Sequence, residues 1–176
     1  MQQLDIAEVN NLIRSSKTEA FHLELLDDYE SPGGDQPYRN WLAGGIEDDY
    51  AWFQDWLSLV REISSRGATM RRAQVVTVPL TDYQRWMLEI TRHNTDAGEE
   101  IRYLPRHLAD RLQLGTDDWW LLDDAIVSFT TFDPAGNWVG GAVTNDPRIV
   151  AYCQGIRDYA WGLAVPYLDF RESGAQ

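Results

Sequence analysis

The chain has 176 residues, 44% of them apolar, which suits one domain with a single core. Acidic residues outnumber basic ones by 28 to 15, and the formal net charge is −13. No apolar run approaches the roughly 20 residues of a membrane-spanning helix, and the acidic N-terminal stretch lacks the pattern of a secretory signal. We therefore expect a cytoplasmic protein without membrane contact, in which the single cysteine, Cys153, stays reduced.

The charge is unevenly distributed along the chain. Residues 1–60 carry a net −9, residues 61–112 a net +2 and residues 113–176 a net −6. All basic residues of the middle segment are arginines, which suit planar anions through forked hydrogen bonds. The negative total repels a phosphate backbone, so the pattern disfavours direct nucleic-acid binding and favours a small anion or a protein partner. Internal salt bridges to the acidic flanks are the structural alternative.

The first third of the chain is predicted to be helical. Residues 1–30 read as one helix or two short ones, with His22 half-buried on it. The prolines and glycines of residues 31–37 predict a loop, and residues 41–50 a surface stretch. Residues 51–66 predict an amphipathic helix that stops at a glycine. Its apolar residues recur at helical spacing: Trp52, Phe53, Trp56, Leu57, Val60 and Ile63.

A crossover unit is predicted in the middle of the chain. Residues 73–80 are rich in β-branched side chains and read as a strand. A helix follows at residues 81–93, then a turn at 94–98 and a second strand at 100–104. This order predicts two parallel strands joined by a right-handed crossover.

The last third reads as a meander followed by a helix. After a helical or irregular passage at residues 107–114, strands are predicted at 119–122, 126–132 and 138–144. Asn145 or Asp146 is expected to cap the final helix, with Pro147 in its first turn.

These elements predict an α/β (or α+β) fold with a mixed sheet of about five to six strands. The central β-α-β unit is followed by the meander, and the N-terminal helices and the C-terminal helix pack on the sheet. We expect a single domain over residues 1–176, divided into a helical N-terminal extension with loop (1–40), a core (41–170) and a tail (171–176).

Motifs for known chemistry are sparse. His22, His93 and His107 show no metal-ligand spacing, and His22-x-Glu24 reads as a two-residue coincidence. No nucleophile elbow or phosphate-binding loop is present, so we assign no catalytic residue, metal or cofactor. Four of the five acidic doublets, Asp117-Asp118 among them, are interpreted as solvated surface. The fifth, Asp123-Asp124, lies between two predicted strands and suits a tight turn or a pocket rim.

A candidate site surrounds the crossover unit, because ligands of open α/β sheets bind beyond the carboxyl ends of strands. Glu100 and Arg102 lie two residues apart on one strand, so they share a face as a salt bridge or as two walls of a polar pocket. The full candidate set adds a stacking wall and a rim residue: Asp82, Tyr83, Arg85, Glu100, Arg102, Arg106, Trp119 and Asp123.

Four motifs carry a family resemblance. They are Val75-Val76 with Pro79-Leu80-Thr81-Asp82-Tyr83-x-Arg85; Ala97-Gly98-Glu99-Glu100-Ile101-Arg102-Tyr103-Leu104-Pro105-Arg106; Asp118-Trp119-Trp120-Leu121-Leu122-Asp123; and Asp146-Pro147 with Arg157-Asp158, Trp161 and Ala164-x-Pro166. Together they resemble the actinobacterial family called domain of unknown function 6879, over about residues 41–170. The resemblance implies no activity. It implies a genomic setting near helix-turn-helix regulators or in specialised-metabolite clusters.

The order of elements is also similar to one half of the phospholipase D-like fold. Enzymes of that fold need His-x-Lys with a downstream aspartate. No histidine of this chain has a lysine two places on, and Lys17 is the only lysine. That chemistry is therefore excluded, and the likeness implies a non-catalytic sensor version of the fold.

Three hypotheses follow. The leading one is a non-catalytic ligand- or partner-binding domain in a regulatory or specialised-metabolism setting, with a small anionic ligand near the arginine-rich crossover unit. The second is a small enzyme of a natural-product pathway in which Asp123, His107 or Glu100 supplies acid-base chemistry. The third is an acidic protein partner of a helix-turn-helix regulator.

Overall fold

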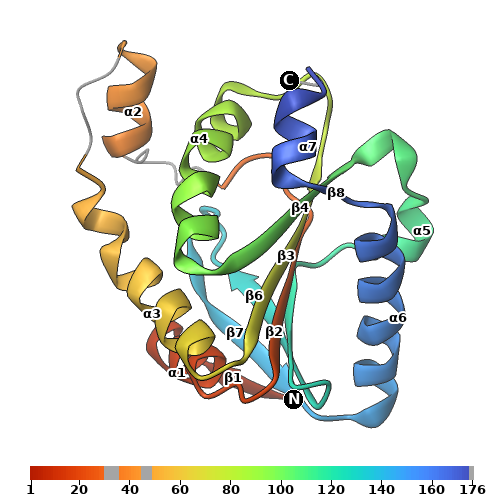
Figure 1. Cartoon of the computed structure of the whole chain (residues 1–176). Helices are drawn as coiled ribbons and strands as arrows, with labels where there is room; N and C mark the ends of the chain where they lie inside the picture. The colour runs from red at the N-terminus through yellow and green to blue at the C-terminus, as the bar shows by residue number, and fades with distance from the viewer. Residues whose placement is uncertain (30–35, 45–48, 175–176) are drawn as a thin grey trace.

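The computed structural model describes residues 1–29, 36–44 and 49–174 and shows one mixed sheet flanked by helices (Figure 1). The sheet has eight strands in the order β1-β7-β6-β5-β2-β3-β4-β8. Their bounds are β1 (Gln2–Leu4), β2 (Glu19–Glu24), β3 (Thr69–Val76), β4 (Glu99–Pro105), β5 (Trp119–Leu122), β6 (Ile126–Phe132), β7 (Trp138–Thr144) and β8 (Val165–Pro166). The prediction of five to six strands was too low, because β1, β2 and β8 were not anticipated.

The sheet combines a parallel centre with antiparallel flanks. β2, β3 and β4 run parallel to one another, which confirms the predicted parallel pair on either side of the crossover helix. β5, β6 and β7 form the predicted antiparallel meander, and β5 joins it antiparallel to β2. The strand that the sequence interpretation missed, β2, therefore lies in the middle of the sheet and connects its two halves.

Helices cover both faces of the sheet. Their bounds are α1 (Ile6–Arg14), α2 (Gln36–Leu42), η1 (Ala51–Phe53), α3 (Gln54–Ser65), α4 (Asp82–Ala97), η2 (Arg106–Leu108), α5 (Arg111–Leu114), α6 (Pro147–Leu163) and α7 (Tyr167–Glu172). The long helix α6 lies on one side of the sheet, and α1, α3 and α4 lie on the other (Figure 1). None of the described helices is long and apolar enough to cross a membrane.

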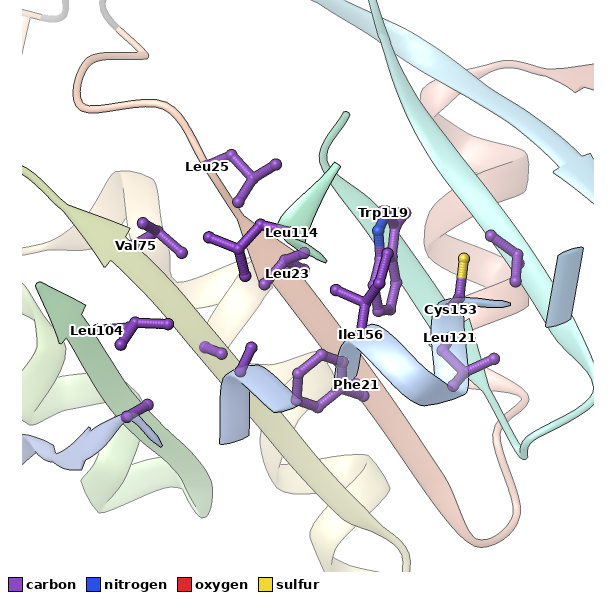
Figure 2. Close-up of a cluster of buried hydrophobic side chains, with 14 of the residues drawn as sticks. Phe21, Leu23, Leu25, Val75, Leu104, Leu114, Trp119, Leu121, Cys153 and Ile156 are labelled. Carbon is purple, nitrogen blue, oxygen red and sulfur yellow. The ribbon is translucent and has the colours of Figure 1, made fainter. Parts of the chain in front are cut away.

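The face under α6 is an apolar core (Figure 2). Phe21 and Leu23 of β2 and Trp119 and Leu121 of β5 pack there against Cys153 and its neighbours on α6. Cys153 is fully buried, and burial raises the pKa of its thiol to about 11, so it is a packed core residue as predicted. The other sheet face carries polar side chains among apolar ones, and it is described with the site below.

The helix predicted over residues 1–30 is wrong. The chain forms β1, the nine-residue α1 and β2 instead. Residues 21–24 alternate between fully buried apolar and polar side chains, and this two-residue period is typical of a strand and not of a helix, so His22 lies on β2. Most of the predicted loop at 31–37 lies outside the described residues, and its last two residues begin α2.

Elsewhere the predicted elements were mostly confirmed. The helix over 51–66 appears as η1 and α3, and α6 begins after Asp146, whose side chain accepts a hydrogen bond of 2.9 Å from the N–H of Arg148. The strand predicted at 73–80 begins earlier and ends at Val76. The turn predicted at 94–98 was wrong, because α4 continues to Ala97 and ends at Gly98 with φ 110°.

Candidate functional site

Three neighbouring strands bring polar side chains together on the face covered by α1, α3 and α4. His22 of β2 pairs in register with Arg72 of β3 on one side and with Trp120 of β5 on the other. Paired residues of neighbouring strands project from the same face, so these three side chains form one row. The next row contains Glu24 of β2 and Asp118, which immediately precedes β5.

The first of these groups is a buried ion network centred on Arg72. Its Nε and Nη2 donate to the two carboxylate oxygens of Glu99 at 2.8 and 3.1 Å, and its Nη1 donates to Oε1 of Glu24 at 3.0 Å. Nδ1 of His22 lies 3.2 Å from the same oxygen of Glu24. The His22 ring also stacks on Trp120, with centroids 4.0 Å apart. The sheet thus holds five ionisable or aromatic groups in contact.

The ion network keeps Glu24 and Arg72 charged in spite of their burial. Burial by itself raises the pKa of Glu24, but the charge of Arg72 and the contacts of His22 outweigh this effect and lower the pKa to about 2. Burial acts to lower the pKa of Arg72, and the charges of Glu24 and Glu99 raise it above the usual range. Glu24 is therefore a carboxylate at every physiological pH.

Asp118 is held in a different way. Its Oδ1 accepts the N–H of Leu25 at 2.7 Å, and its Oδ2 accepts the hydroxyl of Tyr29 at 2.5 Å. Burial raises the pKa of Asp118, and the negative charge of Glu24 adds to this, whereas the bond from Tyr29 opposes it. The two neighbouring carboxyl groups therefore have pKa values displaced in opposite directions.

His22, Glu24, Arg72 and Asp118 form the floor of a pocket of about 310 Å³, here called the sheet-face pocket. A volume of this size suits a small organic ligand. The lining comes from β2, β3, β5, β6, β7 and helices on the same face: Asn10, Ile13, His22, Glu24, Tyr29, Phe53, Trp56, Arg72, Met87, Asp118, Trp120, Thr130, Phe132, Gly136 and Trp138. Aromatic rings provide much of its wall above a polar floor.

Two tryptophans of this wall are fixed by their indole N–H groups. Nε1 of Trp56 donates to Oδ1 of Asn94 at 3.0 Å, and Nε1 of Trp138 donates to the carbonyl of Gly140 at 2.8 Å. Both bonds lead to groups outside the pocket lining. The rings consequently present their carbon surfaces to the pocket and their polar atoms to the protein.

The structure does not gather the predicted site residues in one place. Glu100 and Arg102 project from β4 toward the α6 side, whereas Asp82, Tyr83 and Arg85 belong to α4 on the opposite side of the sheet. The two groups are separated because the crossover helix α4 covers only one face of the sheet, whereas alternate residues of a strand project from opposite faces.

Each of the five residues is already engaged within the protein. Tyr83 is buried among Tyr38 and Trp86, and Arg85 pairs with Asp82 and donates to the carbonyl of Leu80 at 2.7 Å.

On the other side of the sheet, Arg102 lies over the Trp161 ring, 4.3 Å from its centroid, and Nε of Arg71 lies 3.4 Å from Oε2 of Glu100. The salt bridge considered between Glu100 and Arg102 is thus replaced by separate partners.

The remaining three predicted residues also have structural contacts. Trp119 is buried in the α6 core, where it meets Phe21, and it is not a wall of the pocket. Arg106 donates to the carbonyl of Leu25 at 2.6 Å and to the hydroxyl of Thr77 at 3.1 Å. Asp123 has φ 51° and occupies a tight turn. Whether any predicted residue contacts a ligand stays a prediction.

Asp123 joins two distant segments of the chain. Its carboxylate accepts the N–H groups of Lys17, Thr18 and Glu19. Burial acts to raise the pKa of Asp123, but the hydrogen bonds from Thr18 and Lys17 outweigh it and hold the pKa below its usual value. Of the two roles considered for Asp123, the structure therefore shows the turn.

Two arginines of the predicted set line other hollows. Arg85 borders a groove between α4 and α7 with Arg92 and Arg171, and Glu89 stands in the same groove. Arg106 borders a separate surface hollow with Asp27. Each hollow contains an acidic side chain beside its arginines, so neither presents a purely basic surface to an anion.

The pocket residues His22, Glu24, Arg72 and Asp118 were not in the predicted site. One signal could have found the first two, because polar and apolar residues alternate in Phe21-His22-Leu23-Glu24, as in a strand with two different faces. Asp118 was grouped with the exposed Asp117 and interpreted as surface. No local sequence signal connects Arg72 to His22 or to Asp118. These three residues are brought together only by the pairing of β2 with β3 and β5.

A family model described as domain of unknown function (DUF6879) matches residues 7–172. The chain belongs to this family. The match confirms the family resemblance and extends it beyond residues 41–170, so β2 and its pocket residues lie inside the family domain. The actinobacterial setting that the resemblance implies stays a prediction. A comparison with curated proteins finds no match.

A solved structure, NucT from Helicobacter pylori, is similar to this DUF6879 domain. The TM-score is 0.54 at 10% sequence identity, and the match covers 92% of this chain and 89% of that chain. This neighbour fits the likeness to the phospholipase D-like fold. At this identity the likeness concerns the fold alone.

Proposed function

We propose that this DUF6879 domain is a non-catalytic ligand-binding domain and that the sheet-face pocket is its binding site. The observation that carries the proposal is the floor of the pocket, where three neighbouring strands place His22, Arg72 and Glu24 beside Asp118. Polar groups that converge at the base of an apolar pocket are the usual arrangement of a small-molecule site.

The buried charges support a functional role for this face. Burying an ion pair costs several kcal/mol per ion before the pair forms, and apolar residues of similar size are often at least as stabilising. On the opposite face, apolar side chains of the same strands pack under α6 (Figure 2), and Arg71 and Arg157 pair there with Glu19. What distinguishes the pocket face is that its buried charges line a cavity and that the pKa of Glu24 is strongly displaced, which is a common mark of a functional site.

The proposed position differs from the one expected from the arginine-rich crossover unit. Arg102 donates a hydrogen bond to the carbonyl of Trp161, and Arg106 donates one to the carbonyl of Leu25. Arg85 donates one to the carbonyl of Leu80. An anion at these side chains would have to compete with intramolecular partners. We therefore place the proposed site at the sheet-face pocket, whose apolar walls and open amide oxygen of Asn10 do not depend on these three arginines.

A regulatory setting is part of the proposal. A domain of this kind would transmit its bound state to another protein, and the helix-turn-helix regulator implied by the family resemblance is the partner we propose. Co-purification of such a regulator with the domain, changed by ligand, would test this part separately.

The binding proposal can be tested by a thermal-shift and NMR screen against a library of small metabolites. We expect hits whose resonance shifts concentrate at Trp56, Trp120 and Trp138. Trp120→Leu should abolish these hits, whereas Trp52→Leu, at an exposed tryptophan outside the pocket lining, should leave them unchanged. Hits that are indifferent to Trp120→Leu, or no hits at all, would refute the proposal.

A second candidate is an acid-base enzyme at the same pocket. Glu24 and Asp118 are neighbouring carboxyl groups with pKa values displaced in opposite directions, which is a common basis for assigning a proton acceptor and a proton donor. The residues considered for this role from sequence, Asp123, His107 and Glu100, do not line the pocket. Chemical change of a pocket ligand by the wild-type protein, absent in Asp118→Asn, would favour the enzyme.

A further inference from the structure

We infer that the ligand of the sheet-face pocket is an organic cation, an amine or quaternary ammonium attached to an aromatic or apolar body. This inference rests on the proposed binding function and adds the chemical class of the ligand. It follows from which hydrogen-bonding groups of the pocket are already used and which remain open.

Several hydrogen-bond donors that line the pocket already donate to acceptors within the protein. The indole N–H groups of Trp56 and Trp138 and the hydroxyl of Tyr29 all donate to protein acceptors. Arg72 directs three N–H groups to Glu24 and Glu99. An anionic ligand needs free donors, and the arginine of this lining already has two acidic partners, Glu24 and Glu99.

Acceptors, in contrast, remain open. Among the described residues, Oε2 of Glu24 receives no hydrogen bond, because Arg72 and His22 both approach Oε1. The amide oxygen of Asn10 is buried, and no described residue donates to it. Each oxygen of Asp118 accepts one bond and has a second lone pair. A buried acceptor without a partner is costly, so the pocket favours a ligand that donates.

The carboxyl groups and the rings are arranged for a positive charge. Leu23 pairs with Trp119 in the antiparallel ladder, so Glu24 and Asp118 follow as the next neighbours across β2 and β5. An ammonium group between them would meet two carboxyl groups at once. The rings of Trp56, Trp120 and Trp138 would surround the rest of the ligand and attract a cation through their faces.

Charge at longer range points in the same direction. The formal net charge of the protein is −13. A negative net charge attracts cations and repels anions at long range. A bare divalent metal is a poorer occupant, because the described residues contain no group of three or more side chains that could hold one. An organic cation satisfies both the carboxyl groups and the apolar walls.

The test compares three probes of nearly equal shape by calorimetry: 2-phenylethylammonium, 2-phenylethanol and phenylacetate. We expect the ammonium to bind at least tenfold more tightly than the alcohol, and the acetate to bind most weakly. Asp118→Asn and Glu24→Gln should each reduce the preference for ammonium over alcohol at least fivefold. Asp117→Asn, which removes the same charge from the adjacent exposed residue, should leave it unchanged.

Because Glu24→Gln disturbs the ion network, Asn10→Leu is a second variant that removes an acceptor without touching Arg72. It too should weaken the ammonium more than the alcohol. Equal or tighter binding of the alcohol or the acetate would overturn the inference that the ligand is a cation and leave the proposed binding function intact. If no probe binds while the library screen finds other pocket ligands, only the inference of a cationic ligand is wrong. If neither finds a pocket ligand, both proposals fail.

Discussion

The two faces of the central strands β2, β3 and β5 have opposite characters although they are made of alternating residues of the same segments. Under α6, Phe21, Leu23 and Trp119 pack in an apolar core. On the other face, His22 and Glu24 alternate with these residues and meet Arg72 and Trp120 at the floor of the pocket. The comparison shows how one set of strands provides stability on one side and a reactive or binding surface on the other. Changes on each side should therefore have different consequences.

The largest expected effect separates two adjacent tryptophans. Trp119→Ala should lower the free energy of unfolding by about 4 kcal/mol, because it leaves a cavity in the closed core. Trp120→Ala should cost about half of this, because its cavity opens into the existing pocket and water can enter. Urea denaturation measures both. Equal losses would contradict the proposed difference between the faces.

Breaking the ion network should have a somewhat smaller effect. Arg72→Met fills much of the volume but leaves Glu24 and Glu99 buried without their cation, and we expect a loss of about 3 kcal/mol. Adding Glu24→Gln and Glu99→Gln to Arg72→Met should recover most of the loss, since the uncompensated charges are then gone. A triple variant as unstable as Arg72→Met would mean that packing, and not charge, is responsible.

The two carboxyl groups of the pocket should give stability opposite dependences on pH. The pKa of Glu24 is lowered to about 2 in the folded protein from an unfolded value of 4.5, so its contribution is complete above about pH 4.5 and is lost as the pH falls toward 2. The pKa of Asp118 is raised, so its contribution is present at low pH and is lost as the pH rises through the folded pKa.

Unfolding midpoints measured between pH 2 and 7 check these signs. Glu24→Gln should flatten the loss of stability at acidic pH. Asp118→Asn should remove the decline that accompanies ionisation of Asp118. An unchanged acid limb in Glu24→Gln would show that other carboxyl groups dominate it.

The smallest expected effects concern arginine-rich regions outside the pocket. Arg106→Ala removes hydrogen bonds to Leu25 and Thr77 and should cost about 1–2 kcal/mol. Glu100→Ala removes one exposed ion pair with Arg71 and should change stability by less than about 0.5 kcal/mol. Neither should alter binding of 2-phenylethylammonium. A loss of that binding in either variant would indicate that the binding site lies at the crossover unit and not in the sheet-face pocket.

Much of the fold could be predicted because it depends on local patterns. The amphipathic spacing from Trp52 to Ile63, the meander around Asp133 and the capping residue Asp146 each act within one element or one turn. The N-terminal segment was harder, because β1 and β2 are short and α1 separates them. There the alternation of Phe21, His22, Leu23 and Glu24 is the signal that the helical prediction overlooked, and it indicates a strand with two unlike faces.

The sequence by itself determined the acidic charge, the predicted crossover unit and the absence of His-x-Lys, because composition and short motifs need no folded context. Only the tertiary structure decided where the polar residues meet. Glu24, Arg72 and Asp118 lie far apart in the chain, and β-sheet pairing brings them together. Glu100 and Arg102 lie close to Arg85 in sequence, yet the sheet separates them, because a strand directs alternate side chains to opposite faces.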